Sequence, residues 1–244
     1  MLTEWLDAEG RFFHPEPQVR VVPLPHGSHC VVVDNVLANP EGVRQWAASQ
    51  AFRPPTHFPY PGLVLDAPKV LGERMADFFA KHARAPLGGR RTLHQEARLS
   101  LLNTPPEALD HRLWLCHRDV VLVDRSLLCA ASVLYLFHDP ALGGTSFYRP
   151  LRDPQEIDRV LEDSFKLDGP TFSARYGVEP GYMKGDNAHF ARVAKVLAVW
   201  NRAIFYDGSL FHSPDVDQPT LLSSDALRGR LTLNGFFTCK RQAA

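Results

Sequence analysis

A series of short apolar segments, separated by turns and filling the second half of the chain, is the sequence feature that most constrains the fold. Each segment is bounded by turn residues, and together they span 96–104, 113–120, 127–139, 144–150, 193–200, 202–208 and 230–239. Strands at such short intervals are typical of an antiparallel β-structure. The sequence therefore predicts a fold that is mainly β.

The first part of the chain mixes strands with helices. Pro40 suits the first turn of a helix, because its missing N–H costs nothing there. Apolar residues of a later segment recur on one helical face. The predicted elements are strands at 19–24 and 29–36, a proline-rich loop at 52–62, and helices at 40–50 and 67–85.

We expect one domain spanning residues 1–244. This length suits a single domain of the larger kind, and the sequence has no internal repeat or clear linker. The expected division is an N-terminal α/β support at about 1–95 and a β core at about 96–240, with an insert at about 151–190. The insert begins with a helix at 153–165, which an Asp-Pro pair starts, and its remainder is polar and predicts a loop.

Composition limits the partners and the compartment. Lys plus Arg equals Asp plus Glu at 27 each, and no basic run favours nucleic acid as the main partner. The four cysteines form no C-x-x-C pair, as is typical of reduced thiols in a cytoplasmic protein. The N-terminus does not resemble a signal peptide, and the longest apolar run is shorter than the about 20 residues of a membrane helix. We expect a cytoplasmic protein without a membrane or nucleic-acid partner.

The stretch LCHRDVVLVD (115–124) contains a His-Arg-Asp triplet that two chemistries use. A protein-kinase catalytic loop needs an Asn five residues after its Asp, together with a glycine-rich loop, a V-A-I-K strand and a D-F-G motif. Here Asp124 stands at the Asn position and the other motifs are missing from the sequence. The kinase interpretation is therefore disfavoured.

A metal site is the second interpretation of the triplet. Side chains alternate along a strand, so His117 and Asp119 point the same way. A third ligand must come from elsewhere, and His212 stands out among the eleven histidines because it ends an apolar segment after a strand and a turn. Two histidines and one carboxylate leave one face of a metal open, which suits Fe(II) and oxygen chemistry. The alternative is that these are ordinary structural or surface side chains.

Polar residues also alternate along the last strand segment. Arg230, Thr232, Asn234 and Phe236 share one face. Burying such polar groups is costly unless they meet polar partners. If this face looks into a barrel, the planar guanidinium of the arginine is suited to bind a carboxylate with two hydrogen bonds.

With these pieces in order, the sequence resembles the Fe(II)- and 2-oxoglutarate-dependent oxygenases, particularly the prolyl-hydroxylase-like branch. That family shows H-x-D, a strand ending in Tyr-Leu, a Gly-Gly turn followed by an aromatic residue, a distal His, and a basic residue that starts a late strand. The matching pieces, over about residues 96–240, are HRD, SVLYLFHD, GGTSFY, LFHSPD and GRLTLNGFF. The chain is also similar to an uncharacterised bacterial group of this superfamily, with HS after the strand and GRLT-x-N near the end.

The resemblance implies a fold, a metal and a reaction. The fold is a double-stranded β-helix (a jelly-roll, cupin-like core) with supporting N-terminal helices. The implied Fe(II) ligands, with no catalytic residue beyond them, are His117, Asp119 and His212. In related halogenases a small residue replaces the carboxylate, so Asp119 indicates hydroxylation or a related C–H oxidation. The implied enzyme is a dioxygenase that uses O2 on an unidentified small-molecule, amino-acid or peptide substrate and releases succinate and CO2.

The resemblance also implies that 2-oxoglutarate is the cosubstrate. Arg230 would pair with its C5 carboxylate, Tyr135 occupies a position whose hydroxyl often supports that carboxylate, and Asn234 would line the same pocket. Tyr135 is equally interpretable as a core tyrosine. Arg230 lies farther beyond the distal His than is usual in the family, so Arg228 is a competing choice, although it precedes Gly229 and lies outside the strand.

Two other functions remain open at the level of sequence. A zinc hydrolase could use the same three ligands, but it lacks a well-placed general base and leaves Arg230 without a role. A jelly-roll that binds a ligand without catalysis, with a vestigial metal triad, is the non-enzymatic alternative.

Overall fold

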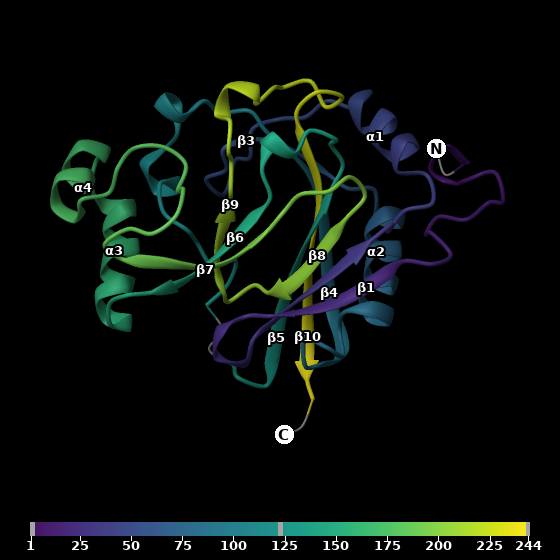
Figure 1. Cartoon of the computed structure of the whole chain (residues 1–244), viewed down its shortest axis with the longest axis horizontal. Coiled ribbons are helices and arrows are strands. Elements are labelled where there is room, and N and C mark those ends of the chain that lie inside the picture. Colours follow the sequence, from purple (N-terminus) through teal and green to yellow (C-terminus); the bar gives the residue numbers. More distant parts are fainter. Residues whose placement is uncertain (1–2, 122–123, 243–244) are drawn as a thin grey trace.

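Two antiparallel sheets form the framework of the molecule. The computed structural model describes residues 3–121 and 124–242. In these residues a seven-stranded sheet has the order β1-β2-β8-β5-β10-β4-β3, and a three-stranded sheet has the order β7-β6-β9 (Figure 1). The strands are β1 Gln18–Pro23, β2 His29–Asp34, β3 Gly62–Asp66, β4 Gly89–Leu102, β5 Leu127–Tyr135, β6 Thr145–Pro150, β7 Phe190–Val196, β8 Ala203–Asp207, β9 Phe211–Pro214 and β10 Arg230–Arg241.

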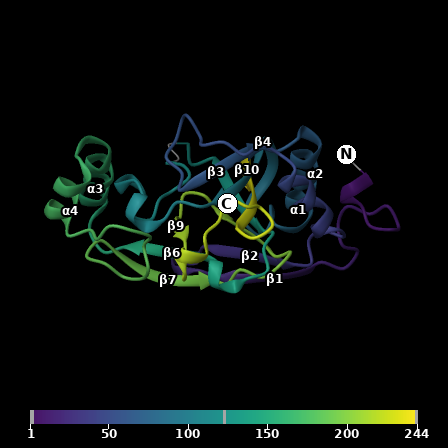
Figure 2. The ribbon, with the colours of Figure 1, turned by 90° about the horizontal axis from the view of Figure 1, so that it is seen from above.

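The part of the chain that the structure describes has four α-helices. They lie at the two ends of the molecule (Figures 1 and 2). They are α1 Pro40–Ala48, α2 Lys69–His82, α3 Pro154–Lys166 and α4 Gly169–Tyr176. Side chains of Asn39, Asp153 and Asp168 cap the starts of α1, α3 and α4 by accepting backbone N–H groups. None of the helices in the described residues is long and apolar enough to cross a membrane.

The two faces of the large sheet have different roles because side chains alternate along each strand. One face carries Leu99, Leu233 and Phe237 and packs against α1 and α2 in the main apolar core. The other face turns toward the small sheet, where Tyr135 of β5 and Phe147 of β6 belong to one buried cluster. The register places Arg98 of β4 opposite Asn234, and Ser100 opposite Thr232, on this second face.

The predicted mixture of α and β with antiparallel sheets is confirmed, and three local predictions need correction. Residues 113–120 do not form a strand: a short 3-10 turn at His111–Leu113, capped by Asp110, is followed by irregular chain with one β-bridge at His117. The remainder of the insert is not all loop, because α4 lies within it. The segment preceding residue 96 is already strand, since β4 begins at Gly89.

Candidate metal centre

The backbone holds the two candidate histidines face to face. The N–H of His117 donates to the carbonyl of His212 at 3.0 Å, and the N–H of His212 donates back at 2.9 Å. This pair is an isolated antiparallel bridge between β9 and the irregular segment before β5. The imidazole rings lie on the same side, with centroids 4.5 Å apart. Their spacing is therefore fixed by main-chain hydrogen bonds and not by the side chains alone.

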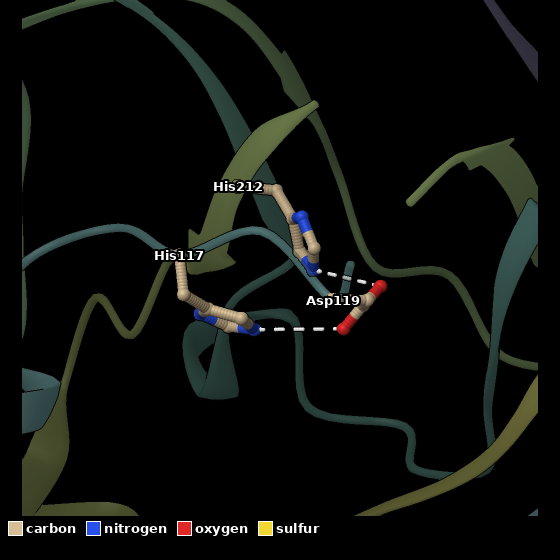
Figure 3. A group of neighbouring side chains, drawn as sticks. All are labelled: His117, Asp119 and His212. Atoms are coloured by element: carbon tan, nitrogen blue, oxygen red, sulfur yellow. Dashed lines mark ion pairs between the residues drawn. The ribbon is translucent and has the colours of Figure 1, made fainter. Parts of the chain in front are cut away.

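Asp119 completes a cluster with both histidines (Figure 3). Its N–H donates to the carbonyl of Gly208 at 2.8 Å, which anchors the segment to the turn after β8. The carboxylate oxygens lie 3.8 Å from Nε2 of His117 and 3.5 Å from Nε2 of His212. One ligand atom from each of the three residues lies within 4.8 Å of the others.

The distances suit a single metal ion. Two donor atoms bound at about 2.1 Å in neighbouring octahedral positions lie about 3.0 Å apart. The two measured N–O distances exceed this value by less than about 1 Å, which small side-chain rotations supply. The structure therefore brings together the three ligands predicted from the sequence.

The protonation states also suit a metal. A carbonyl can only accept, so Nδ1 of His212, 2.9 Å from the carbonyl of Leu210, carries the proton and leaves the Nε2 lone pair toward Asp119. Burial lowers the pKa of His117 and of His212 to about 4, so both imidazoles are neutral at pH 7. Burial raises the pKa of Asp119, and the charges of His117 and Arg98, which lower it, offset this only in part. Two neutral imidazoles and a desolvated carboxylate are a donor set that a divalent cation stabilises.

The triad opens onto a cavity of about 670 Å³ between the sheets. The side chain of His117 is 52% exposed, that of Asp119 18% and that of His212 6%. His117 is surrounded by protein yet accessible, because its exposed surface belongs to the cavity wall. A cavity of this size accommodates a small organic molecule.

Arg230, the first residue of β10, lies in the wall of the same cavity and is only 4% exposed. Its Nε donates to the carbonyl of Gly143 at 3.2 Å and its Nη2 to that of Gly144 at 2.8 Å. No carboxylate within residues 3–121 and 124–242 forms an ion pair with it. Arg228, the competing residue, is exposed and does not line the cavity. A buried guanidinium without an acidic partner is a suitable site for an anion.

The Gly-Gly turn is explained by this contact. Gly143 has a φ of +80°, and a Cβ there would overlap the carbonyl oxygen of Asp215. A Cβ on Gly144 would overlap the carbonyl oxygen of Val196. Only glycine allows the turn to approach both neighbours while its carbonyls face Arg230.

Tyr135 and Asn234 stand in different relations to the cavity. Tyr135 is fully buried, its hydroxyl lies 2.8 Å from Oγ1 of Thr145, and burial raises its pKa to about 12. Thr145 lines the cavity, so the tyrosine lies behind it as a core residue that orients the threonine hydroxyl. Asn234 lines the cavity directly and donates to Oγ of Ser100 at 2.8 Å.

Several residues that line the cavity were not predicted from the sequence. Tyr60, from the proline-rich loop, and Tyr206 of β8 line the wall, and the Tyr206 ring lies edge-on to His212 with centroids 4.7 Å apart. Arg98 of β4 lines it too. The signal for Arg98 was present, because Arg98 and Ser100 alternate with apolar residues just as the polar residues of β10 do.

The chain matches one protein-family model and none of the curated proteins. The model of a family described as a family of unknown function, DUF6445, matches residues 15–237.

Solved structures similar to this chain include HygX from Streptomyces hygroscopicus with nickel and 2-oxoglutarate bound, at 12% identity and a TM-score of 0.49, covering 86% of this chain and 82% of that chain. The non-heme alpha ketoglutarate dependent epimerase SnoN from nogalamycin biosynthesis is 14% identical, with a TM-score of 0.45 and coverages of 87% and 81%. A Pseudomonas putida prolyl-4-hydroxylase is 16% identical, with a TM-score of 0.37 and coverages of 100% and 100%.

Proposed function

We propose that this chain, which belongs to the DUF6445 family of unknown function, is an Fe(II)- and 2-oxoglutarate-dependent dioxygenase that hydroxylates an unactivated C–H bond of an organic substrate. One observation carries the proposal: a cavity wall presents two neutral histidines and a carboxylate together with a buried guanidinium that has no acidic partner among the described residues. The first group suits a divalent metal, and the second suits the far carboxylate of a keto-diacid.

The proposal extends to the architecture. The small sheet β7-β6-β9 and the strands of the large sheet that face it would form the two halves of a double-stranded β-helix. The cavity lies between these halves, with β10 supplying Arg230 and β9 supplying His212. This is the arrangement implied by the resemblance to the oxygenases.

In this proposal His117 and His212 bind the metal through Nε2 and Asp119 binds it through its carboxylate. These three residues would hold the metal from the cavity wall, which is the donor set that suits Fe(II) and oxygen chemistry. Bound Fe(II) would couple the oxidative decarboxylation of 2-oxoglutarate, to succinate and CO2, to the oxidation of substrate by O2. Because Asp119 supplies a carboxylate where related halogenases have a small residue, hydroxylation is the reaction we assign.

The chain positions the cosubstrate through Arg230. Its guanidinium is held by the carbonyls of Gly143 and Gly144, and its remaining N–H groups are available to the C5 carboxylate. The hydroxyl of Thr145, which is hydrogen-bonded to that of Tyr135, is a further polar group on the same wall. These contacts orient a dicarboxylate and disfavour a neutral ligand, which would leave the buried cation unpaired.

Protein groups also shield the metal centre. Phe147 and Tyr206 pack around His212, with Phe147 6.4 Å and Tyr206 4.7 Å from its ring centroid. Burial raises the pKa of the Tyr206 hydroxyl, and the nearby carboxylate of Asp119 raises it further, so this hydroxyl stays protonated. The surroundings of the distal ligand are therefore apolar, which limits access of bulk water to it.

The proposal is tested by titrating anaerobic, metal-free protein with Fe(II) and 2-oxoglutarate. A keto acid bound to Fe(II) through two oxygens gives a weak visible charge-transfer band. We expect this band in the wild-type protein and its loss in the double variant His117→Ala, Asp119→Ala. If neither Fe(II) nor 2-oxoglutarate binds to the folded wild-type protein, the triad is not an oxygenase site. Tight binding of Zn(II) without 2-oxoglutarate would point instead to a hydrolase.

A further inference from the structure

The cavity contains a second guanidinium that the proposed reaction does not use. Four arginines line its wall. Arg112 forms an ion pair with Asp110 at 2.6 Å, Arg118 forms one with Asp158 at 3.0 Å, and Arg230 donates to backbone carbonyls. The side chain of Arg98 has neither an ion pair nor a hydrogen bond to the described part of the chain, and its Nε is buried without a partner. It is therefore the cavity arginine with the most unmet hydrogen-bonding capacity.

Two aromatic rings hold Arg98 in place. Its Cζ lies 4.3 Å from the ring centroid of Phe58 and 4.6 Å from that of Phe236. Such contacts use the faces of the guanidinium and leave the N–H groups at its edge free. Phe58 belongs to the proline-rich loop, so this loop forms part of the cavity wall. An aromatic clamp that exposes a planar row of donors is suited to a planar or tetrahedral oxyanion.

Acidic groups near Arg98 do not satisfy it. Burial lowers the pKa of Arg98 and is the largest effect on it. Three more distant carboxylates, those of Asp119, Glu96 and Asp66, raise this pKa in part. None of the three approaches within the distance of an ion pair in the described chain. The charge of Arg98 also acts on Asp119, whose pKa it lowers against the effect of burial, so Arg98 lies within electrostatic range of the metal triad.

Arg98 and Arg230 occupy different positions in the cavity wall. Arg98 lies opposite Asn234 in the register of β4 and β10, four residues along β10 from Arg230. At about 3.3 Å per residue, the two backbone positions are about 13 Å apart along the strands. The guanidinium of Arg230 is held by carbonyls of the Gly-Gly turn, whereas that of Arg98 is held by two aromatic rings, so the cavity wall has two separate places for an anion.

We propose that Arg98, clamped by Phe58 and Phe236, binds an oxyanion of the substrate, so that the substrate class is organic acids with a carboxylate or phosphate group attached to an apolar body. The assignment to the substrate rests on the proposed function, in which Arg230 takes 2-oxoglutarate. The oxyanion pairs with the edge of Arg98, and the apolar body lies along the aromatic rings. Arg98 is in this proposal a specificity-determining residue that does not touch the metal.

Binding of matched probes tests the proposal. The wild-type protein, loaded with Ni(II) and 2-oxoglutarate so that no turnover occurs, is titrated with phenylacetate, phenyl phosphate and the neutral phenylacetamide. We expect the better of the two anions to bind roughly tenfold or more tightly than the amide. Preference for phenylacetate identifies a carboxylate site, and preference for phenyl phosphate identifies a phosphate site. Equal binding of anions and amide, or no binding of any probe at millimolar concentration, overturns the proposal.

Variants assign the preference to one residue. Arg98→Met removes the preference for the anion and leaves binding of the amide and of 2-oxoglutarate unchanged, whereas Arg112→Met, which alters an arginine already paired in the same wall, changes neither. Arg98→Lys, which keeps the charge without the fork, gives an intermediate preference and serves if Arg98→Met does not fold. Loss of 2-oxoglutarate binding in Arg98→Met would overturn the proposal by making Arg98 the cosubstrate anchor.

The same titrations distinguish failure of this inference from failure of the proposed function. They are repeated on metal-free protein, because the contacts of Arg98 do not involve the metal ligands. If Ni(II) and 2-oxoglutarate do not bind but the Arg98-dependent preference persists, the oxygenase proposal fails and the anion site stands. If both ligands bind and the preference is missing, the oxygenase proposal stands and the anion site is wrong.

Discussion

Replacing Arg230 with methionine should separate ligand binding from folding. Arg230 is 4% exposed and lacks an acidic partner among the described residues. Methionine is unbranched, adaptable and apolar, and it fills much of the same space. We expect Arg230→Met to change the free energy of unfolding of the metal-free protein by less than about 2 kcal/mol, because the terms nearly cancel.

The magnitude follows from the hydrogen bonds of the guanidinium. Without Arg230 the carbonyl of Gly143 loses its donor, at a cost of about 1–3 kcal/mol, while that of Gly144 keeps the N–H of Asp215 at 3.1 Å. Against this loss stands the desolvation of an unpaired cation, which amounts to several kcal/mol and disappears in the variant. For 2-oxoglutarate there is no such cancellation. Removing one partner of a buried charge pair costs about 2–5 kcal/mol, or roughly 30-fold to several-thousand-fold in affinity.

Two measurements on the same samples separate the effect of Arg230→Met on stability from its effect on 2-oxoglutarate affinity. Urea denaturation of metal-free protein gives the change in stability, and calorimetric titration of the Ni(II)-loaded protein with 2-oxoglutarate gives the change in affinity. The matched control is Arg228→Met, which alters an exposed arginine two residues away and should change neither quantity. The reasoning is refuted if Arg230→Met lowers stability by more than about 3 kcal/mol and leaves the affinity intact, since Arg230 would then only clamp the Gly-Gly turn.

Three further predictions concern the surroundings of the site. Gly143→Ala should lower stability by about 2 kcal/mol or more, because it combines a φ of +80° with a backbone overlap; an unchanged urea midpoint would contradict the turn geometry. Burial raises the pKa of Tyr135 from 10.0 to about 12, so its contribution to stability is present below pH 10 and is lost as the pH rises toward 12. Across this range the urea midpoint should fall less steeply with pH in Tyr135→Phe than in the wild-type protein. Equal slopes in the two proteins would contradict this pKa shift. Burial raises the pKa of Cys30 to about 12, so a thiol reagent at pH 8 should not label Cys30 in the folded protein. The same reagent should label Cys129, which lies in the cavity wall, and peptide mapping would show which cysteine is modified.

The strands were the most predictable part of the fold. Apolar alternation located β5, β6, β8 and β10 to within a few residues, because each of them buries a face against the same core. The segment at 113–120 was predicted as a strand, but it does not form one. It is apolar in composition, yet it shares only the bridge at His117 with a neighbouring strand. Pairing partners of a strand are not encoded in its own sequence.

The helix α4 was missed for a different reason. Its Gly- and Pro-containing composition is typical of a loop. The local signals were nevertheless present: Asp168 caps the start, Pro170 lies in the first turn, and Gly177 ends the helix with a φ of +62°. Phe172 is fully buried in a cluster with Leu115 and Ile157, which supplies the tertiary contact that composition cannot reveal.

The candidate site was predictable where spacing within one segment sufficed. His117 and Asp119 are two residues apart, and the polar face of β10 is visible in its alternation. The bridge between His117 and His212 joins residues far apart in the chain, and only the fold fixes it. For Arg98 the sequence predicted the strand but not which face of that strand points into the cavity. The face determines whether an arginine is exposed to solvent or lines the cavity.

Binding of a metal and of anions in the cavity would be coupled to folding. Asp119 lies between two histidines that are neutral at pH 7, and Arg98 and Arg230 have no acidic partner in the described chain, so three charged groups are desolvated without an ion pair there. Each such group lowers the stability of the folded chain. A divalent cation at the triad and anions at the arginines would offset these costs, and ligands that bind only the folded state raise its stability in proportion to the logarithm of their concentration. A cavity built only for stability would have paired these charges internally or replaced them with apolar side chains.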